Sequence, residues 1–309
     1  MLRKMIRKIN IAGLALAWLS ASALCGYGGG KDMTLLMRNA DGKGGRWFSS
    51  NSVELVSEVS GYIRKAKPDK VEGRIVAGIA PHAGYMYSGP IAGYTFRAIQ
   101  ENLGTNLLET VVVVGFTHGE QYEGVALMDG DAVETPIGRT ALDKEGMEIL
   151  VKKSHRIFTR YSPHVREHSA ENELPFAQSA VPGAKLIVGL IGDHDMKTID
   201  ELAGALSELS GKKRIVVVAS TDLLHDADYE LVTKTDKETL KKIAAIDVDG
   251  VAGSWSPRAQ VCCGIAPVLA VMKFAKLQGC DKGTVLHYRN SGDDFPESRG
   301  SWVGGYGAV

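Results

Sequence analysis

Three short hydrophobic runs in this chain each end on a histidine. The runs are 74–82, 111–118 and 215–225, which end on His82, His118 and His225 respectively. Each run is rich in β-branched residues and closes on Gly, Pro or Ser, a pattern typical of a buried strand in an α/β sheet. In open α/β sheets, ligands bind beyond the carboxyl ends of the strands. We therefore expect the three imidazoles to converge at one edge of a sheet, and this arrangement indicates a metal centre.

A cysteine further along the chain is a candidate member of the same site. Cys263 and Gly264 directly precede the apolar stretch Ile265–Leu277, which predicts a helix. A thiol near a helix N-terminus has a lowered pKa, so it is more readily a thiolate. Cys263 is therefore a candidate metal ligand or nucleophile. The alternative is a small buried side chain, which is what most free cysteines are.

Other polar side chains lie close to these positions in the sequence. Asp222 precedes His225 by three residues, and such a carboxylate can orient a metal-bound imidazole or a general base. Tyr85 adds a phenolic donor near the first of the three histidines. His168 and Glu171 are one helical turn apart, so both can face one cleft beside the ligands. The alternative for each is structural, as a turn group bonded to the backbone or as a surface side chain.

The elements that must position these groups alternate along the chain. Apolar periodicity predicts helices at 52–66, 88–102, 143–152, 170–181, 198–209, 236–246 and 265–277, and further strands are expected at 185–191, 284–288 and 302–306. Such alternation is the pattern of a layered α/β protein. We predict a single layered αβ domain with a central, mostly parallel sheet. The acidic, glycine-broken stretch 119–138 predicts a hairpin-like excursion.

The first residues have the composition of an export signal. Residues 1–10 carry four basic residues and no acid, and 11–24 are almost wholly apolar. The apolar run is too short for a bilayer span, which needs about 20 residues. Ala21-Ser22-Ala23 supplies a cleavage pattern, which predicts a signal peptide at 1–23, a flexible spacer at 24–37 and the folded domain at 38–309. We expect an exported protein, periplasmic or extracellular, and the competing interpretation is a lipid anchor at Cys25.

Composition and missing motifs exclude several classes of function. Lys plus Arg total 36 and Asp plus Glu total 36, so the formal net charge is zero and no basic excess is left for nucleic acid. The chain contains no GxxxxGK(S/T) motif, no GxGxxG after a strand and no GxSxG. These absences argue against nucleotide binding and against serine hydrolase chemistry.

Several segments together resemble the Memo family, whose bacterial members are called AmmeMemoRadiSam system protein B. The matching segments, in chain order, are 81–85 (Pro-His-Ala-Gly-Tyr), 115–118 (Gly-Phe-Thr-His), 134–138 (Glu-Thr-Pro-Ile-Gly), 167–171, 220–225 and 263–264. The resemblance implies a fold similar to that of class III extradiol ring-cleaving dioxygenases, which are non-heme iron enzymes. It also implies that His82, His118 and Cys263 are metal ligands and that His225 is an acid–base residue.

Two features of the chain depart from the pattern of that family. The family usually has a Gly-Pro-Ser-His-His turn where this chain has Gly-Phe-Thr-His-Gly at 115–119, so a proline and a second histidine are missing. Members are usually cytosolic, whereas this chain begins with an apparent export signal.

The leading hypothesis is a mononuclear metal protein with redox or dioxygenase-like activity. Two imidazoles and one anionic ligand resemble a facial arrangement that leaves positions open for a small ligand. Iron(II) is favoured, and copper or zinc is the alternative because a thiolate prefers softer metals. His225, oriented by Asp222, would be the acid–base group.

Two rival hypotheses use the same residues. A non-catalytic protein would hold a metal or a peptide in the same pocket, and a nucleophilic enzyme would use Cys263 with His225. The ligand class, small molecule or peptide, stays open at this point.

Overall fold

The computed structural model of the protein describes residues 35–37, 46–103 and 107–309. All described elements belong to the second of two units into which the chain divides, Met1–Asp32 and Met33–Val309. The predicted signal peptide at 1–23, most of the spacer at 24–37 and Cys25 lie outside the described residues. No helix among the described residues is long and apolar enough to cross a membrane.

A six-stranded sheet forms the centre of the second unit. The strand order is β2 (Ala77–Ala80), β9 (Ile215–Ser220), β3 (Thr110–Phe116), β8 (Lys185–Ile191), β4 (Val125–Leu127) and β7 (Ile157–Thr159). All neighbours are parallel except β4 and β8, which are antiparallel. Strands β3 and β9 are buried along their whole length, as continuous apolar runs of a sheet covered on both faces must be. The prediction of a mostly parallel α/β sheet is therefore confirmed.

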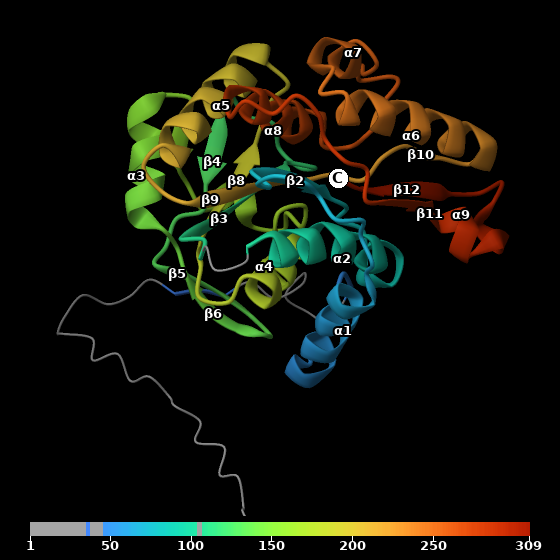
Figure 1. The fold of residues 1–309 in the computed structure, drawn as a ribbon, viewed down its shortest axis with the longest axis horizontal. Helices are drawn as coiled ribbons and strands as arrows, with labels where there is room; N and C mark the ends of the chain where they lie inside the picture. Colours follow the sequence, from blue (N-terminus) through green and yellow to red (C-terminus); the bar gives the residue numbers. More distant parts are fainter. Residues whose placement is uncertain (1–34, 38–45, 104–106) are drawn as a thin grey trace, which may run out of the picture. The chain divides into compact units, whose positions relative to one another are not determined.

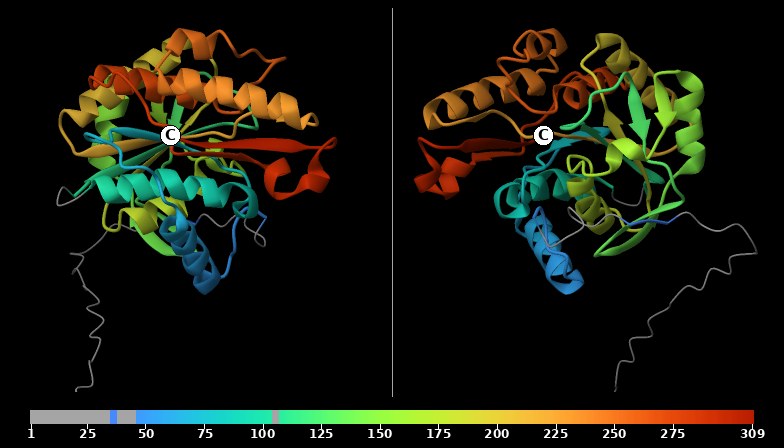
Figure 2. Two further views of the ribbon diagram at one scale, coloured as in Figure 1. Left: turned by 45° about the vertical axis from the view of Figure 1, so that its right-hand side comes forward. Right: turned by 180° about the vertical axis from the view of Figure 1, so that it is seen from behind.

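Helices cover both faces of this sheet (Figures 1 and 2). One face carries α2 (Tyr85–Asn102) and α4 (Leu174–Ala180), with α1 (Ser52–Lys65) packed on the outside of both. The other face carries α8 (Ile265–Leu277) and α5 (Met196–Ser210), with α3 (Lys144–Lys153) beside α5. Helix α1 is amphipathic and buries its apolar side, and the Asn51 side chain accepts hydrogen bonds from its first turn.

Two small sheets complete the described part of the chain. One has the order β1 (Leu35–Met37), β5 (Ala132–Thr135), β6 (Gly138–Ala141), and the other has the order β10 (His225–Asp226), β12 (Val303–Ala308), β11 (His287–Asn290). The remaining elements are α6 (Tyr229–Ala244), α7 (Val248–Ala252), α9 (Ser291–Asp294) and the 3-10 turns η2 (Ser162–His164), η3 (Glu171–Glu173) and η4 (Pro296–Ser298). Pairing of β10 with β12 places His225 opposite Gly304, so the last strand supports the third of the histidines.

Several element boundaries differ from those predicted. Helix α2 begins at Tyr85 instead of residue 88, because the Tyr85 N–H donates to the Trp47 carbonyl, a partner that local sequence does not reveal. Helix α6 begins at Tyr229 instead of residue 236, because the Asp228 side chain caps it.

The predicted helix at 170–181 and the predicted excursion at 119–138 are each divided. Residues 171–173 form the turn η3, and α4 starts with Pro175 in its first turn, where a proline needs no N–H partner. Strand β4 joins the central sheet, whereas the hairpin consists of β5 and β6.

Gly115, near the end of β3, allows another segment of the chain to approach this strand closely. A Cβ at this position would lie 2.8 Å from the Ala170 backbone nitrogen and would collide with the Ser169 hydroxyl. The Ser169 hydroxyl also donates to the Phe116 carbonyl at 2.8 Å. The absence of a side chain at Gly115 therefore lets the segment that carries His168 lie against the end of β3.

We expect Gly115→Ala to destabilise the protein by about 1–3 kcal/mol, because the added methyl group meets backbone atoms that cannot move away. Urea unfolding monitored by tryptophan fluorescence measures the change. Gly204→Ala in α5 is the matched control, since a Cβ there has no neighbour within 4 Å and should stabilise the helix by about 0.5–1 kcal/mol. Equal stabilities of the two variants would contradict the packing argument.

Candidate metal centre

His82, His118 and Cys263 come together beyond the carboxyl ends of the central strands. His82 follows β2 by two residues, His118 follows β3 by two residues, and Cys263 lies just before α8. One ligand atom from each of the three side chains lies within 4.8 Å of the others. His82 Nε2 is 3.3 Å from Cys263 Sγ, and the rings of His82 and His118 are 5.3 Å apart between centroids. The structure thus contains a His/His/Cys group that could hold a metal ion.

Both imidazoles are held through the nitrogen that faces away from the thiol. His118 Nδ1 lies 3.0 Å from Glu167 Oε1, and His82 Nδ1 lies 2.9 Å from Ser220 Oγ. A histidine whose Nδ1–H is donated to such a partner presents the lone pair of Nε2 to a metal. The donor set of two imidazole nitrogens and one sulfur, within 4.8 Å of one another, therefore fits a metal ion.

Glu167 is a buried carboxylate that the sequence did not assign to the site. It accepts hydrogen bonds from the backbone N–H groups of His118, His168 and Ser169 at 2.6 to 2.8 Å. Burial raises its pKa, but the hydrogen bonds and charge of His118 outweigh burial and hold the pKa well below its usual range. Glu167 is therefore an ionised acceptor for His118. The only sequence signal for it was its place in the family segment 167–171.

Cys263 has the environment of a thiolate. Burial disfavours its charged form, but the charge of His82 and hydrogen bonds from His118 and His82 outweigh burial and lower the pKa to about 5. The Asp222 backbone N–H also donates to the sulfur at 3.3 Å. The group therefore offers one soft anionic ligand, and each imidazole offers a nitrogen ligand once its Nε2 gives up a proton to the metal.

Asp222 fixes the end of β2 and lies beside His225. One of its oxygens accepts the His82 and Ala83 backbone N–H groups at 2.8 and 3.2 Å. The other is 3.6 Å from His225 Nε2, a distance at which the interaction is mainly electrostatic. Burial raises the pKa of Asp222, but the charge of His82 and the interaction with His225 lower it to about 2.

His225 lies next to the three candidate ligands but is not part of their group. Burial lowers its pKa, whereas the Asp222 carboxylate raises it by a larger amount. The exposed Trp302 lies 5.4 Å from its ring. An imidazole beside a carboxylate, at the margin of the group, has the environment of a proton donor or acceptor.

The structure places the three expected supporting residues in three different environments. These residues are Tyr85, His168 and Glu171. Tyr85 is buried and its hydroxyl donates to the Asn172 carbonyl at 2.6 Å, so this hydroxyl supports the η3 turn. His168 stacks between Trp47 and His118, with centroid distances of 3.9 and 4.7 Å. Glu171 is buried within η3. Their predicted supporting roles stay predictions.

His168 is the neutral histidine of the group. Burial lowers its pKa, the charges of His82 and His118 lower it further, and the result is about 3. Trp47, which covers its ring, was missed by sequence reasoning because no local pattern around residue 47 marks it. His118, Glu167 and His168 form a second set of ligand atoms within 4.8 Å of one another, which shares His118 with the first.

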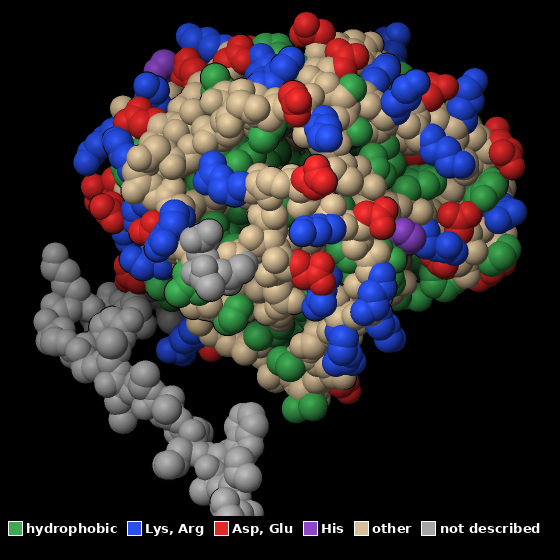
Figure 3. Space-filling view, viewed as in Figure 1, with side chains coloured by type: hydrophobic (Ala, Val, Ile, Leu, Met, Phe, Trp, Pro, Cys, Tyr) green, Lys and Arg blue, Asp and Glu red, His purple; other side chains and the backbone are tan. Residues whose placement is uncertain are grey.

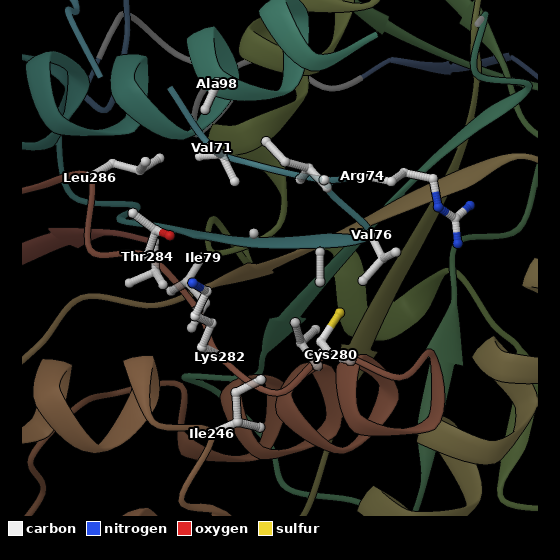
Figure 4. Close-up of a pocket in the computed structure, with 18 of the residues that line it drawn as sticks. Val71, Arg74, Val76, Ile79, Ala98, Ile246, Cys280, Lys282, Thr284 and Leu286 are labelled. Atoms are coloured by element: carbon white, nitrogen blue, oxygen red, sulfur yellow. The ribbon is translucent and has the colours of Figure 1, made fainter. Parts of the chain in front are cut away.

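A separate cavity of about 590 Å³ lies beside β2, between α2 and α8. Its lining includes none of the candidate site residues. Figure 4 shows aliphatic side chains around it, among them Val71, Ile79 and Leu286. Figure 3 shows this apolar hollow, with charged side chains of both signs around it. Lys70, Arg74 and Lys282 are accompanied by Glu72 and Asp281, so the charge of the lining selects no ligand class.

Fold and site together define an α/β protein with a His/Cys group, capable of metal binding, at the carboxyl ends of its sheet. The model of the Memo-like protein family matches residues 40–309, and the chain belongs to this family. A MEMO1 family protein of Methanopyrus kandleri is 32% identical over 75% of this chain and 81% of its own length. A MEMO1 family protein of Aeropyrum pernix is 32% identical over 86% of this chain and 96% of its own length.

Among solved structures, the chain is similar to an uncharacterized protein from Escherichia coli K12. The TM-score is 0.43 at 16% sequence identity, and the match covers 69% of this chain and 91% of that chain. A likeness this weak assigns neither a fold family nor a function.

We expect Cys263 in metal-free protein to react with iodoacetamide as a thiolate. With a pKa of about 5, its thiol stays ionised between about pH 8 and about pH 6 and loses reactivity only as the pH falls through 5. An ordinary cysteine, with a pKa of about 8.5, already loses reactivity as the pH falls below that value. Peptide-resolved mass spectrometry measures the rate at each cysteine. Cys280 is the internal control, because burial raises its pKa. Parallel pH profiles for the two cysteines would rule out the thiolate.

Proposed function

We propose that this protein is a mononuclear metal protein whose ion is held by His82, His118 and Cys263. The observation that carries the proposal is the convergence of two Nε2 atoms and one thiolate sulfur within 4.8 Å, with both Nδ1 atoms engaged elsewhere. Imidazole and thiolate ligands suit iron, copper and zinc. We favour iron(II), because the family resemblance includes a likeness to non-heme iron dioxygenases.

The chemistry that we propose is oxidative and dioxygenase-like. His82, His118 and Cys263 would hold the ion, which would supply coordination positions for dioxygen or another small ligand. In this chain His225 would move the proton, because the neighbouring Asp222 carboxylate raises its pKa. Glu167 and Ser220 would keep the two imidazoles in the tautomer that binds metal.

A non-catalytic role in binding a metal or a peptide is the second candidate. The observation that favours it is the aromatic surface next to the group, where Trp47 covers His168 and Trp302 is 62% exposed beside His225. Aromatic side chains that border a polar pocket are common in peptide recognition. The two candidates share one metal site and differ in whether it turns over a substrate.

We expect protein purified without oxygen to contain one metal ion per chain and His82→Ala to contain none. Glu167→Gln should weaken metal binding by about 10–100-fold, because the neutral amide no longer holds His118 as an ionised carboxylate does. Elemental analysis and competition with a chelator measure the change. Glu148→Gln is the matched control, since Glu148 pairs with Lys152 on the surface of α3. Absence of bound metal in the wild-type protein would overturn the proposal.

Oxygen uptake with catechol-like substrates separates the candidate functions. The enzyme hypothesis expects uptake by the wild type and its loss in His225→Gln, which keeps the metal ligands intact. Bound metal with no uptake in any variant would favour the binding protein. Activity in metal-free protein that alkylation of Cys263 abolishes would indicate nucleophilic catalysis instead.

We further propose that the chain is exported. The basic residues 1–10, the apolar residues 11–24 and the small residues 21–23 support this proposal. Cell fractionation followed by N-terminal sequencing should find mature protein outside the cytoplasm that begins at residue 24. Cytoplasmic protein with an intact N-terminus would contradict export, and a lipid-modified Cys25 would establish the anchored form.

A further inference from the structure

A fully buried carboxyl group lies behind the candidate ligand His82, and the proposed function does not use it. Glu173, in η3, is not exposed at all, and its Oε1 is 2.9 Å from the Ser220 hydroxyl. Its second oxygen, Oε2, has no hydrogen-bond partner among the described residues. A buried carboxylate with a single polar neighbour would be strongly destabilising if it carried a charge.

The hydroxyl group of Ser220 has three polar neighbours and only one proton. Ser220 Oγ lies 2.7 Å from the Ser169 carbonyl, 2.9 Å from Glu173 Oε1 and 2.9 Å from His82 Nδ1. The Ser169 carbonyl can only accept, so it takes the proton of the hydroxyl. The two lone pairs of Ser220 then remain for Glu173 and His82, and each of these groups must donate.

This assignment satisfies every group around the hydroxyl. Glu173 donates only if its carboxyl group is protonated, and His82 donates only as the Nδ1–H form. Burial raises the pKa of Glu173 by more than the Ser220 hydroxyl and the charge of His82 lower it, and the resulting pKa of about 8 agrees with a neutral carboxyl group. His82 and His118 therefore have different supports, since His118 donates to the ionised Glu167.

We propose that Ser220 and a protonated Glu173 form a positioning pair that keeps a proton on His82 Nδ1 and directs its Nε2 toward Cys263. The effect of this pair on metal binding rests on the proposed metal centre, whereas the hydrogen bonds around Ser220 do not depend on a metal. Neutral Glu173 donates to one lone pair of the Ser220 hydroxyl, and the hydroxyl donates its own proton to the Ser169 carbonyl. The hydroxyl therefore cannot donate its proton to His82 Nδ1. Such a bond would place the proton of a neutral His82 on Nε2, the nitrogen that faces Cys263.

The test uses the full chain with cobalt(II) as the probe ion. Coordinated imidazoles give exchangeable, paramagnetically shifted Nδ1–H proton resonances, and we expect two of them, from His82 and His118. Ser220→Ala should weaken cobalt binding by about 10–100-fold and remove one of the two resonances, because His82 loses its acceptor. Ser220→Thr keeps the hydroxyl and should restore both. Ser210→Ala, which removes another serine bonded to a carbonyl, is the matched control.

Infrared spectroscopy at neutral pH measures whether the Glu173 carboxyl group is protonated, and the measurement does not require a bound metal. The difference spectrum between wild type and Glu173→Gln should contain the band of a protonated carboxyl group. Absence of that band overturns the inference, and so does wild-type cobalt affinity with both resonances in Ser220→Ala. Presence of the band in a wild type that binds no cobalt would instead overturn the proposed metal centre and leave the pairing of Glu173 with Ser220 in place.

Discussion

The parallel register of β2, β9 and β3 is the constraint on which the site depends. Ala80 of β2 lies opposite Ser220 of β9, and Ala219 lies opposite Val114 of β3, so the three strands end at nearly one level. The turns after these strands consequently deliver His82, Asp222 and His118 to one edge. A slip of one residue in either pairing would turn every side chain of that strand to the other face of the sheet. Both faces of β3 and β9 are buried under helices, so a slip would place each side chain against the wrong neighbours in a close-packed core.

The candidate site is stabilised by electrostatic attraction between buried anionic groups and the neighbouring imidazoles. Glu167, Asp222 and Cys263 are each held ionised by neighbouring histidines or backbone N–H groups, whereas burial alone would favour their neutral forms. Removing one partner from such a group leaves an uncompensated buried charge. The same coupling means that the arrangement of protons, and not merely the positions of the side chains, sets which nitrogen atoms are available to a metal.

The turn at 115–119 presents His118 to the candidate site. Phe116 packs against His194 with 4.4 Å between the ring centroids, and the His118 backbone N–H is bonded to Glu167. The position of His118 is therefore fixed by Glu167, from a segment about fifty residues further along the chain. Close packing at Gly115 is what allows that segment to reach the end of β3.

Much of the fold was predictable because its signals are local. Runs of β-branched residues marked β2, β3 and β9, and helical periodicity marked most of the helices. The boundaries that were wrong, at Tyr85 and Tyr229, depend on a backbone contact from Trp47 and on a cap by Asp228. The roles of Glu167 and Ser220 were not predictable, because a buried Glu or Ser has no periodic signature and acts only on the residues that folding brings beside it.

The amino-acid sequence by itself determined the strands, the residues that follow them and hence the candidate ligands His82, His118 and Cys263. Side-chain type and strand ends are properties of neighbouring residues in the chain, so a linear pattern contains them. Only the tertiary structure decided which nitrogen of each imidazole is free, which carboxyl groups are charged, and that Glu167, Ser220 and Glu173 lie behind the ligands. Those properties depend on burial and on hydrogen bonds between segments tens to more than a hundred residues apart.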